Sequence, residues 1–330
     1  MKRALLVLLA GCGTFQDPDI VIDFRVLGMS ATVPEQIVDI DITQPVQPAD
    51  ILEQLVETKV CVLLSDKNFT RNLRWKMTLC NLNGDQRCND GAPHSDLGEG
   101  LWPDPDLTPA PPEMCAVVPA DGNLLGVILE SLQGDQFKGL GGIYYGVSLV
   151  VGGEDADPTL DLYAAKNLRV QPRIPPELQP NNNPYLSGVD VRLAEDGDEF
   201  MPLPIENARC IDYANRFEDP IIVVPEQKIR FQPVEPDGVR EVYVVPTTDG
   251  GSRTFTESLT YQWLASAGKY SSGSTGGVRD PFGNPPPLFT DWTAPKAKDL
   301  EGPTDVSFWV VQRDERLGLA WYESCVRVVP

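Results

Sequence analysis

Short runs of alternating apolar and polar residues, separated by turn-forming residues, recur along most of the chain. Trp75, Met77 and Leu79, for example, alternate with less apolar positions, the period-two pattern of a half-buried strand. The 28 glycines and 31 prolines mark turns between such runs. Further strand-like runs are 37–42, 59–64, 143–151, 221–224, 227–231, 239–245, 259–264, 306–312 and 321–329. We therefore predict an all-β fold built from antiparallel β-sandwiches.

One segment departs from this pattern. Apolar residues at 124, 125, 128, 129 and 132 fall on one face of a helix, and Asp121 is a suitable N-cap. This spacing predicts a single short helix over 123–132.

A proline- and asparagine-rich stretch, QPRIPPELQPNNNP, divides the chain at 171–184. Prolines remove the N–H donors of a strand ladder, and the asparagine run favours turns. We predict a first β-sandwich domain at 22–170, a linker at 171–184 and a second β-sandwich domain at 185–330. Two domains also agree with a length of 330 residues.

The N-terminus has the pattern of an export signal. A basic start is followed by ALLVLLA at 4–10, an apolar run too short to span a bilayer, and then by LAGC at 9–12. LAGC resembles the bacterial lipobox, which is cleaved before its cysteine after a lipid is attached to the thiol. The resemblance implies that residues 1–11 are removed, that Cys12 is lipidated and that residues 12–21 form a tether. An ordinary cleaved signal with a chance cysteine is the alternative.

The residue after Cys12 also bears on localisation. It is glycine rather than aspartate, which in lipobox proteins goes with export to the outer membrane. We therefore expect a lipid-anchored protein of the cell envelope, held at the outer membrane.

Cysteine count supports an oxidising compartment. With Cys12 assigned to lipid, six cysteines remain, and an even set in an exported chain is expected to form disulfides. A zinc site would need closer cysteine pairs than the chain offers. Sequence alone does not select among the possible pairings; the ones we predict are Cys61–Cys115, Cys80–Cys88 and Cys210–Cys325.

Several aromatic motifs in the second half point to a family. They are YQW at 261–263, ASAG at 265–268, DWTAP at 291–295 and FWVVQRDERLG at 308–318. These motifs resemble bacterial immunoglobulin-like modules. The chain is similar, more narrowly, to lipobox lipoproteins abundant in myxobacteria, in which two such modules follow the anchor. The first half shares RVL at 25–27, the Cys80 and Cys88 pair and GLGG at 139–142. The resemblance implies two immunoglobulin-like sandwiches and assigns no activity.

Charge and motif content argue against several functions. Lys and Arg total 27 against 48 Asp and Glu, for a formal charge of -21, and such a field repels nucleic acid. The single histidine, His94, makes histidine-based catalysis unfavourable. The sequence has no G-x-S-x-G elbow, P-loop or G-x-G-x-x-G motif. We expect no enzymatic activity and no cofactor.

Two acidic clusters are the exception to consider for metal binding. Asp155 and Asp157 belong to one cluster, and Asp196 and Asp198 to the other. Oxygen-rich turns of this kind can bind a structural Ca²⁺, although neither matches the EF-hand pattern. Solvated turns are the favoured interpretation in so acidic a protein.

Aromatic side chains in two long predicted loops, 81–113 and 266–291, are the best ligand signal. Trp102, Tyr270 and Phe282 are suited to stack on sugar rings or to anchor a protein. The alternative is that they fold down over the ends of the sandwiches.

These observations favour a lipid-anchored envelope lipoprotein that acts as a non-enzymatic interaction or structural subunit with an envelope protein partner. A glycan- or surface-ligand-binding adhesin, which uses the loop aromatics to hold polysaccharide, is the alternative.

Overall fold

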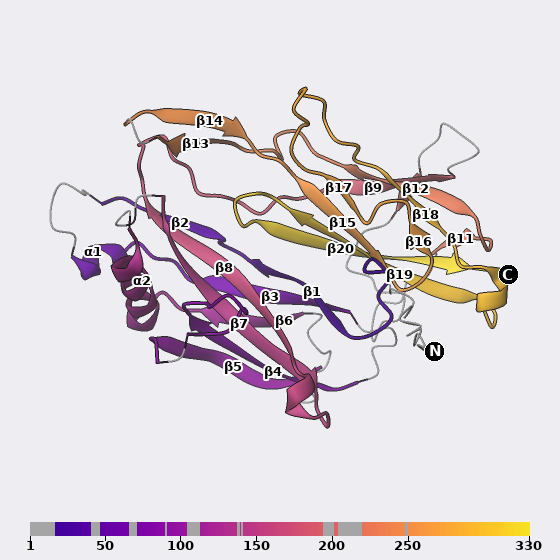
Figure 1. Ribbon diagram of the computed structural model, residues 1–330, viewed down its shortest axis with the longest axis horizontal. Coiled ribbons are helices and arrows are strands. Elements are labelled where there is room, and N and C mark those ends of the chain that lie inside the picture. The colour runs from indigo at the N-terminus through magenta and orange to yellow at the C-terminus, as the bar shows by residue number, and fades with distance from the viewer. Residues whose placement is uncertain are drawn as a thin grey trace, which may run out of the picture.

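The computed structural model describes residues 17–40, 47–65, 71–89, 91–103, 113–136, 139, 141–193, 201–203, 220–247 and 250–330. It is nearly all β and consists of two immunoglobulin-like β-sandwich domains that lie against one another (Figure 1). The predicted signal peptide, Cys12, the first part of the tether, Cys210, Asp196 and Asp198 lie outside the described residues.

The described residues of the first domain form eight strands in two sheets with orders β1-β3-β6 and β2-β8-β7-β4-β5. Their bounds are β1 Arg25–Ala31, β2 Glu35–Val38, β3 Thr58–Ser65, β4 Leu73–Cys80, β5 His94–Trp102, β6 Met114–Val118, β7 Ile143–Gly153 and β8 Leu162–Pro172.

The second domain has sheets with orders β10-β9-β12-β18-β16 and β11-β20-β19-β15-β17, and a separate two-stranded pair, β13-β14. The bounds are β9 Gly188–Leu193, β10 Met201–Leu203, β11 Ile221–Val223, β12 Lys228–Val234, β13 Val242–Pro246, β14 Ser252–Thr256, β15 Thr260–Ala265, β16 Lys269–Tyr270, β17 Ser274–Gly276, β18 Thr290–Thr293, β19 Thr304–Arg313 and β20 Leu319–Val328.

One sheet of each domain has the same strand order. In each, an early edge strand pairs parallel with the last strand, β2 with β8 and β11 with β20, whereas the other pairs of named strands are antiparallel. From that edge inward, the order β2-β8-β7-β4-β5 corresponds to β11-β20-β19-β15-β17, whereas the opposite described sheets differ, with three strands in the first domain and five in the second. This shared strand order is a clearer sign that the two halves are structurally similar than any short sequence motif.

The predicted helix is present as α2, Gly122–Gly134. Asp121 is its N-cap, and its carboxylate accepts from the N–H groups of Asn123 and Leu124. Shorter helical turns are α1 Pro48–Leu52, η1 Pro158–Leu160 and η2 Ala297–Asp299. Among the described residues, none of the helices has the length and hydropathy needed to cross a bilayer.

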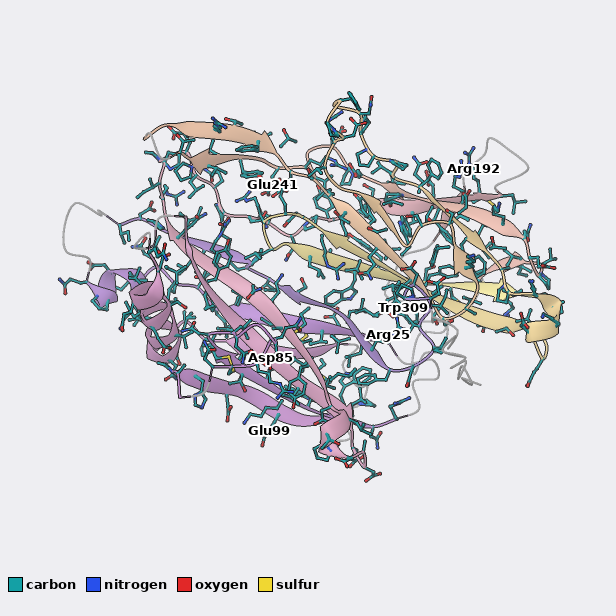
Figure 2. All side chains as sticks on the ribbon, in the orientation of Figure 1. Arg25, Asp85, Glu99, Arg192, Glu241 and Trp309 are labelled. Carbon is teal, nitrogen blue, oxygen red and sulfur yellow. A yellow bond between two sulfur atoms is a disulfide. The ribbon has the colours of Figure 1, made fainter. Side chains whose placement is uncertain are left out.

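The hydrophobic cores bind the domains together. The second domain centres on aromatic rings, with Phe308 packed 5.0 Å from Phe231 and 4.9 Å from Trp292. The first domain's core extends across the junction, because Trp309 and Leu319 of the second domain belong to it. Figure 2 labels Trp309. Because they share this core, the two domains form one packed unit. Burial of apolar surface contributes about 25 cal/mol per Å² to the stability of the fold.

Disulfides reinforce the first domain. Cys61–Cys115 joins the neighbouring strands β3 and β6, and Cys80–Cys88 closes a small loop after β4. Disulfides of this kind typically stabilise a fold by about 2–4 kcal/mol. Cys325 is buried on β20 and disulfide-bonded, while its predicted partner Cys210 lies outside the described residues.

The N-terminal segment is part of the fold earlier than the sequence predicted. The Val21 N–H donates to the Ala265 carbonyl at 2.8 Å, and the Ala265 N–H donates to the Asp19 carbonyl at 3.1 Å. Val21 itself is fully buried. The described part of the predicted tether, 17–21, therefore packs against β15, because this pairing satisfies backbone groups and buries an apolar side chain.

Candidate functional site

Two of the three aromatic residues predicted to bind a ligand are buried. Trp102 ends β5 inside the first core, and Tyr270 lies on β16 with its hydroxyl donating to the Leu264 carbonyl at 3.2 Å. Both residues are 6% exposed, whereas Phe282 is 89% exposed. The prediction for Trp102 and Tyr270 is wrong because the supposed loops contain strands, and strands direct alternate side chains inward.

The described acidic cluster is committed to local structure. Asp157 caps η1 by accepting from the Thr159 N–H and hydroxyl, both at 2.9 Å, and these hydrogen bonds lower the pKa of Asp157. Asp161 pairs with Arg74. In the part of the chain that the structure describes, one group of three ligand-type side chains converges, Cys61, Glu113 and Cys115. Its cysteines form a disulfide, so this group does not fit a metal. Calcium binding at Asp155 and Asp157 stays a prediction.

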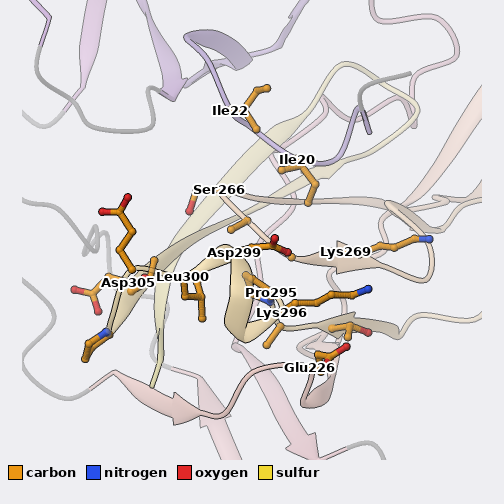
Figure 3. Close-up of a pocket in the computed structure, with 17 residues that line it drawn as sticks. Ile20, Ile22, Glu226, Ser266, Lys269, Pro295, Lys296, Asp299, Leu300 and Asp305 are labelled. Carbon is orange, nitrogen blue, oxygen red and sulfur yellow. The ribbon is translucent and has the colours of Figure 1, made fainter. Parts of the chain in front are cut away.

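A pocket of about 1020 Å³ lies at one end of the second domain (Figure 3). Its walls come from the N-terminal segment at Ile20 and Ile22, the turn 266–269, residues 293–296 at the end of β18, and the segment 299–305. The ASAG and DWTAP motifs therefore build this pocket, and the anchored N-terminal segment lines it.

The turn at Gly268 shows why these motifs have small residues. Gly268 has a φ of +91°, and a Cβ there would collide with the Trp292 indole and come within 2.7 Å of the Thr293 carbonyl. The indole Nε1–H donates to the Ala267 carbonyl at 2.9 Å. Only glycine permits this approach, so the motif shapes the wall of the pocket rather than supplying a reactive group.

The pocket carries separated charges. Figure 3 shows Lys269 and Lys296 extending toward one side and Asp305 on the other. Asp305 pairs with Arg327 at 2.7 Å. His94 lies on β5 of the first domain, exposed, with Nδ1 3.0 Å from the Ala92 carbonyl. The one histidine of the chain is therefore not placed to serve as a base in this pocket.

A second feature is a buried ionic cluster at the domain junction, centred on the fully buried Glu35 of β2. Its carboxylate accepts from Arg169 Nε at 2.7 Å, Gln171 Nε2 at 2.5 Å and the Asn181 N–H at 2.8 Å. Arg316 from the β19–β20 turn adds a bond of 2.7 Å from Nη2. The predicted linker starts too early, because Gln171 is still part of β8. The buried Asn181 joins the domains: its N–H donates to Glu35, and its side-chain amide lies 3.0 Å from both Asp314 Oδ2 and the Arg316 carbonyl.

Arg316 is surrounded by further carboxylates. Its Nη1 lies 3.4 Å from both Glu241 and Glu257, and its guanidinium lies 4.7 Å from the centre of the Tyr243 ring. Burial, together with repulsion from Asp314 and Glu241, raises the pKa of Glu257 to about 7. We call Glu35, Arg169, Gln171, Asn181, Glu241, Glu257, Asp314 and Arg316 the junction cluster.

The third feature is the pair β13-β14, which we call the ribbon, residues 242–246 and 252–256. It lies apart from the sandwich sheets, at the upper left of Figure 1. None of its ten residues is buried, and Val242, Val245 and Phe255 are 64%, 40% and 43% exposed. Arg253 is its one charged residue, in a chain with 23% charged residues. A strand over 239–245 was predicted, but its separation from the sandwich was not.

The free edge of the ribbon follows from its register. The backbone N–H and C=O groups that face β14 belong to residues 241, 243, 245 and 247. This follows from the register and from two backbone hydrogen bonds, Glu257 N–H to Glu241 O and Thr247 N–H to Gly251 O. The backbone groups of Val242 and Val244 therefore point to the other edge. In the described residues no strand pairs with that edge, and it borders a pocket of about 380 Å³ beside Arg169, Leu178 and Arg316.

No family model and no curated protein matches the sequence. Among solved structures, the chain is similar to a transglutaminase of red sea bream, at 8% identity and a TM-score of 0.23, over 94% of this chain and 32% of that one. It is also similar to a β-glucuronidase of Parabacteroides merdae, at 9% identity and a TM-score of 0.17, over 90% of this chain and 24% of that one. Similarity to the collagen adhesin of S. aureus is at 8% identity and a TM-score of 0.15, over 92% of this chain and 93% of that one. The chain spans about a third or less of the first two proteins. No argument rests on TM-scores this low, and the fold assignment rests on the strand topology.

Proposed function

We propose that the protein is a lipid-anchored, non-enzymatic subunit of the cell envelope that binds a protein partner through the ribbon. The observation that carries the proposal is the ribbon itself, a pair of strands with one charged residue, no buried residue and an edge that is unpaired among the described residues. Protein interfaces are depleted of charge at their centres and enriched in aromatic residues. Exposed apolar strands with free edges are otherwise a liability for aggregation.

The partner we infer is a protein that lays an extended apolar segment along β13. The outward N–H and C=O groups of Val242 and Val244 offer main-chain hydrogen bonds to such a strand. The pocket beside Val244, Val245 and Leu178 would accept its side chains. A polysaccharide has no matching strand geometry, so this surface favours a protein.

The junction cluster keeps the ribbon in place. Tyr243 rests over the Arg316 guanidinium, and its hydroxyl donates to Glu315 at 2.7 Å. Arg316 is in turn bonded to Glu35 in the first domain. The base of the ribbon is therefore attached to both domains, which lowers the entropic cost of presenting it to a partner.

The anchor would set the orientation on the membrane. Asp19 is fixed to β15, and the chain from Cys12 to Asp19 spans at most about 25 Å when extended. A lipid on Cys12 would hold the end of the second domain that bears the 1020 Å³ pocket near the bilayer. The ribbon lies toward the opposite end of the molecule, as Figure 1 shows by the places of β11 and β13.

The proposal is tested in cells with tagged protein cross-linked in its own envelope. We expect a stoichiometric protein adduct that is lost in the Val242→Ser/Phe255→Ser variant and in Val244→Pro, which blocks the edge. Ile222→Ser, which alters a 68% exposed side chain on β11, is the matched control. Retention of the adduct by both ribbon variants, with their folding verified by circular dichroism, would contradict the proposal.

The anchor is tested separately. Metabolic labelling with a palmitate analogue should modify the wild-type chain and not Cys12→Ser, and the labelled protein should fractionate with the outer membrane. A wild-type chain that stays unlabelled would rule out the lipid anchor while leaving the ribbon interaction open.

A further inference from the structure

A smaller pocket, of about 320 Å³, lies on the first domain, away from the ribbon. This open pocket is bordered by the disulfide loop after β4, the C-terminal half of α2, and strands β7 and β8. The residues that line it are Asn81, Leu82, Asn89, Glu130, Ser131, Gly134, Tyr144, Tyr145 and Asn167. Most are polar, in contrast to the apolar interior of the sandwich on the other face of the same sheet.

The disulfide loop forms a rigid wall of this pocket. Leu82 packs so closely over Gly146 of β7 that a Cβ at that position would collide with it. The Ser148 hydroxyl donates to the Gln86 carbonyl at 2.9 Å, and the Arg87 guanidinium lies 3.8 Å over the Tyr163 ring. With Cys80–Cys88 closing its base, the loop is attached to the sheet at several points.

The opposite wall is attached to the loop through Asn81. The Asn81 amide donates to the Val127 carbonyl at 3.2 Å and to Glu130 Oε2 at 3.0 Å, and its oxygen accepts from the Ser131 hydroxyl at 2.6 Å. Ser131 also lies 2.9 Å from the Tyr144 carbonyl. These bonds position α2 and β7 relative to the loop before any ligand binds.

Several polar side chains that line the pocket have donors and acceptors free to bind a ligand. The side-chain amides of Asn89 and Asn167 make no hydrogen bond to the residues that the structure describes, and Glu130 keeps its second carboxylate oxygen. Tyr144 is 50% exposed, and its hydroxyl accepts from Arg169 Nη1 at 3.3 Å. The pocket thus combines two amides, a carboxylate oxygen and an aromatic ring whose position is fixed.

We infer that this pocket binds a neutral oligosaccharide. Sugar hydroxyls both donate and accept, which matches amide and carboxylate side chains, and the apolar face of a sugar ring stacks on an aromatic ring. The volume is within the range of small-ligand sites. Glu130 and the chain's net charge of -21 disfavour an anionic glycan. The inference is independent of the ribbon and goes beyond the proposed function.

The test uses the full mature chain with Cys12→Ser, titrated by calorimetry with short neutral oligosaccharides of glucose, mannose, galactose and N-acetylglucosamine. We expect saturable binding to at least one of them. Loss of the ring in Tyr144→Ala should weaken it about tenfold, the effect of removing a stacking contact of roughly 1.4 kcal/mol. Asn167→Ala should weaken it to a similar degree, and Tyr144→Phe should retain most of it.

Tyr185→Ala is the matched control, because that tyrosine is 55% exposed and does not line the pocket. Circular dichroism and thermal unfolding establish that each variant is folded. The inference is overturned if none of the sugars binds, or if Tyr144→Ala binds as tightly as the Tyr185→Ala control.

Discussion

At the scale of single residues, the junction cluster is the feature that most strongly distinguishes this molecule. Glu35 and Arg316 are 281 positions apart, yet they meet with Arg169 and Asn181 around one buried carboxylate. A buried charge is tolerated only when it is paired and hydrogen-bonded. No pattern in the sequence signals such a meeting, because Glu35 and Arg316 belong to segments whose spacing along the chain is unrelated. The cluster therefore could not be predicted.

Removal of one partner should be costly. We expect Arg316→Ala to lower the free energy of unfolding by about 3–5 kcal/mol, because Glu35 would lose one of its two guanidinium partners inside the junction. Urea unfolding followed by fluorescence measures this. Lys76→Ala, which removes an exposed ion pair with Asp96, should cost less than about 1 kcal/mol. Equal effects of the two substitutions would show that the cluster is not a stabilising contact.

Glu257 should make stability depend on pH. Its pKa is about 7 in the folded protein against an ordinary value of 4.5, so between these values the folded state holds more protons than the unfolded state. The free energy of unfolding should therefore fall as pH rises through this window, by up to about 3 kcal/mol. Glu257→Gln removes this dependence, and we expect the variant to match wild type near pH 5 and to exceed it near pH 8.

Urea midpoints at a series of pH values test the difference between the two proteins. The comparison cancels the opposing contribution of Lys166, whose pKa burial lowers to about 8. Parallel pH profiles for wild type and Glu257→Gln would contradict the assignment.

At the scale of elements, the sequence pattern was most informative where a periodicity was long. The helix over 123–132 appears as α2 because five apolar residues and a capping aspartate all agree. The predicted loops 81–113 and 266–291 were wrong in part, since they contain β5, β16 and β17. β5 is an edge strand with few apolar residues, and β16 and β17 are too short to show a period. Trp102 and Tyr270 consequently were mistaken for surface aromatics.

The turn between β15 and β16 offers a test of how its motif works. Gly268→Ala should destabilise the protein by well over 1 kcal/mol, because the added Cβ meets the Trp292 indole as well as requiring a positive φ. Gly283→Ala is matched in φ, at +85° against +91°, and has no atom within 4 Å of the added Cβ. The free energy of unfolding of this variant should fall by only about 1 kcal/mol, because a non-glycine residue disfavours the positive φ. Thermal unfolding of both variants measures the difference, and equal losses would show that the indole contact is unimportant.

At the scale of the whole molecule, the shared core makes the two domains, which repeat the strand order of one sheet, one body, with the N-terminal segment at one end and the ribbon toward the other. The two-domain, all-β class was predictable from turn spacing and strand-like runs. The ribbon as a separate element was not, because its alternation is that of an ordinary strand and its neighbours are decided by tertiary packing.

The most direct test of this account is site-specific photo-cross-linking in the intact envelope, with the cross-linker placed at Val242 of the ribbon. Val278, which is 71% exposed in the loop after β17, serves as the comparison position. The account predicts a discrete protein adduct at Val242, none at Val278, and loss of the Val242 adduct when Cys12 is changed to serine. Adducts at both positions alike, or none at Val242 in the anchored protein, would contradict it.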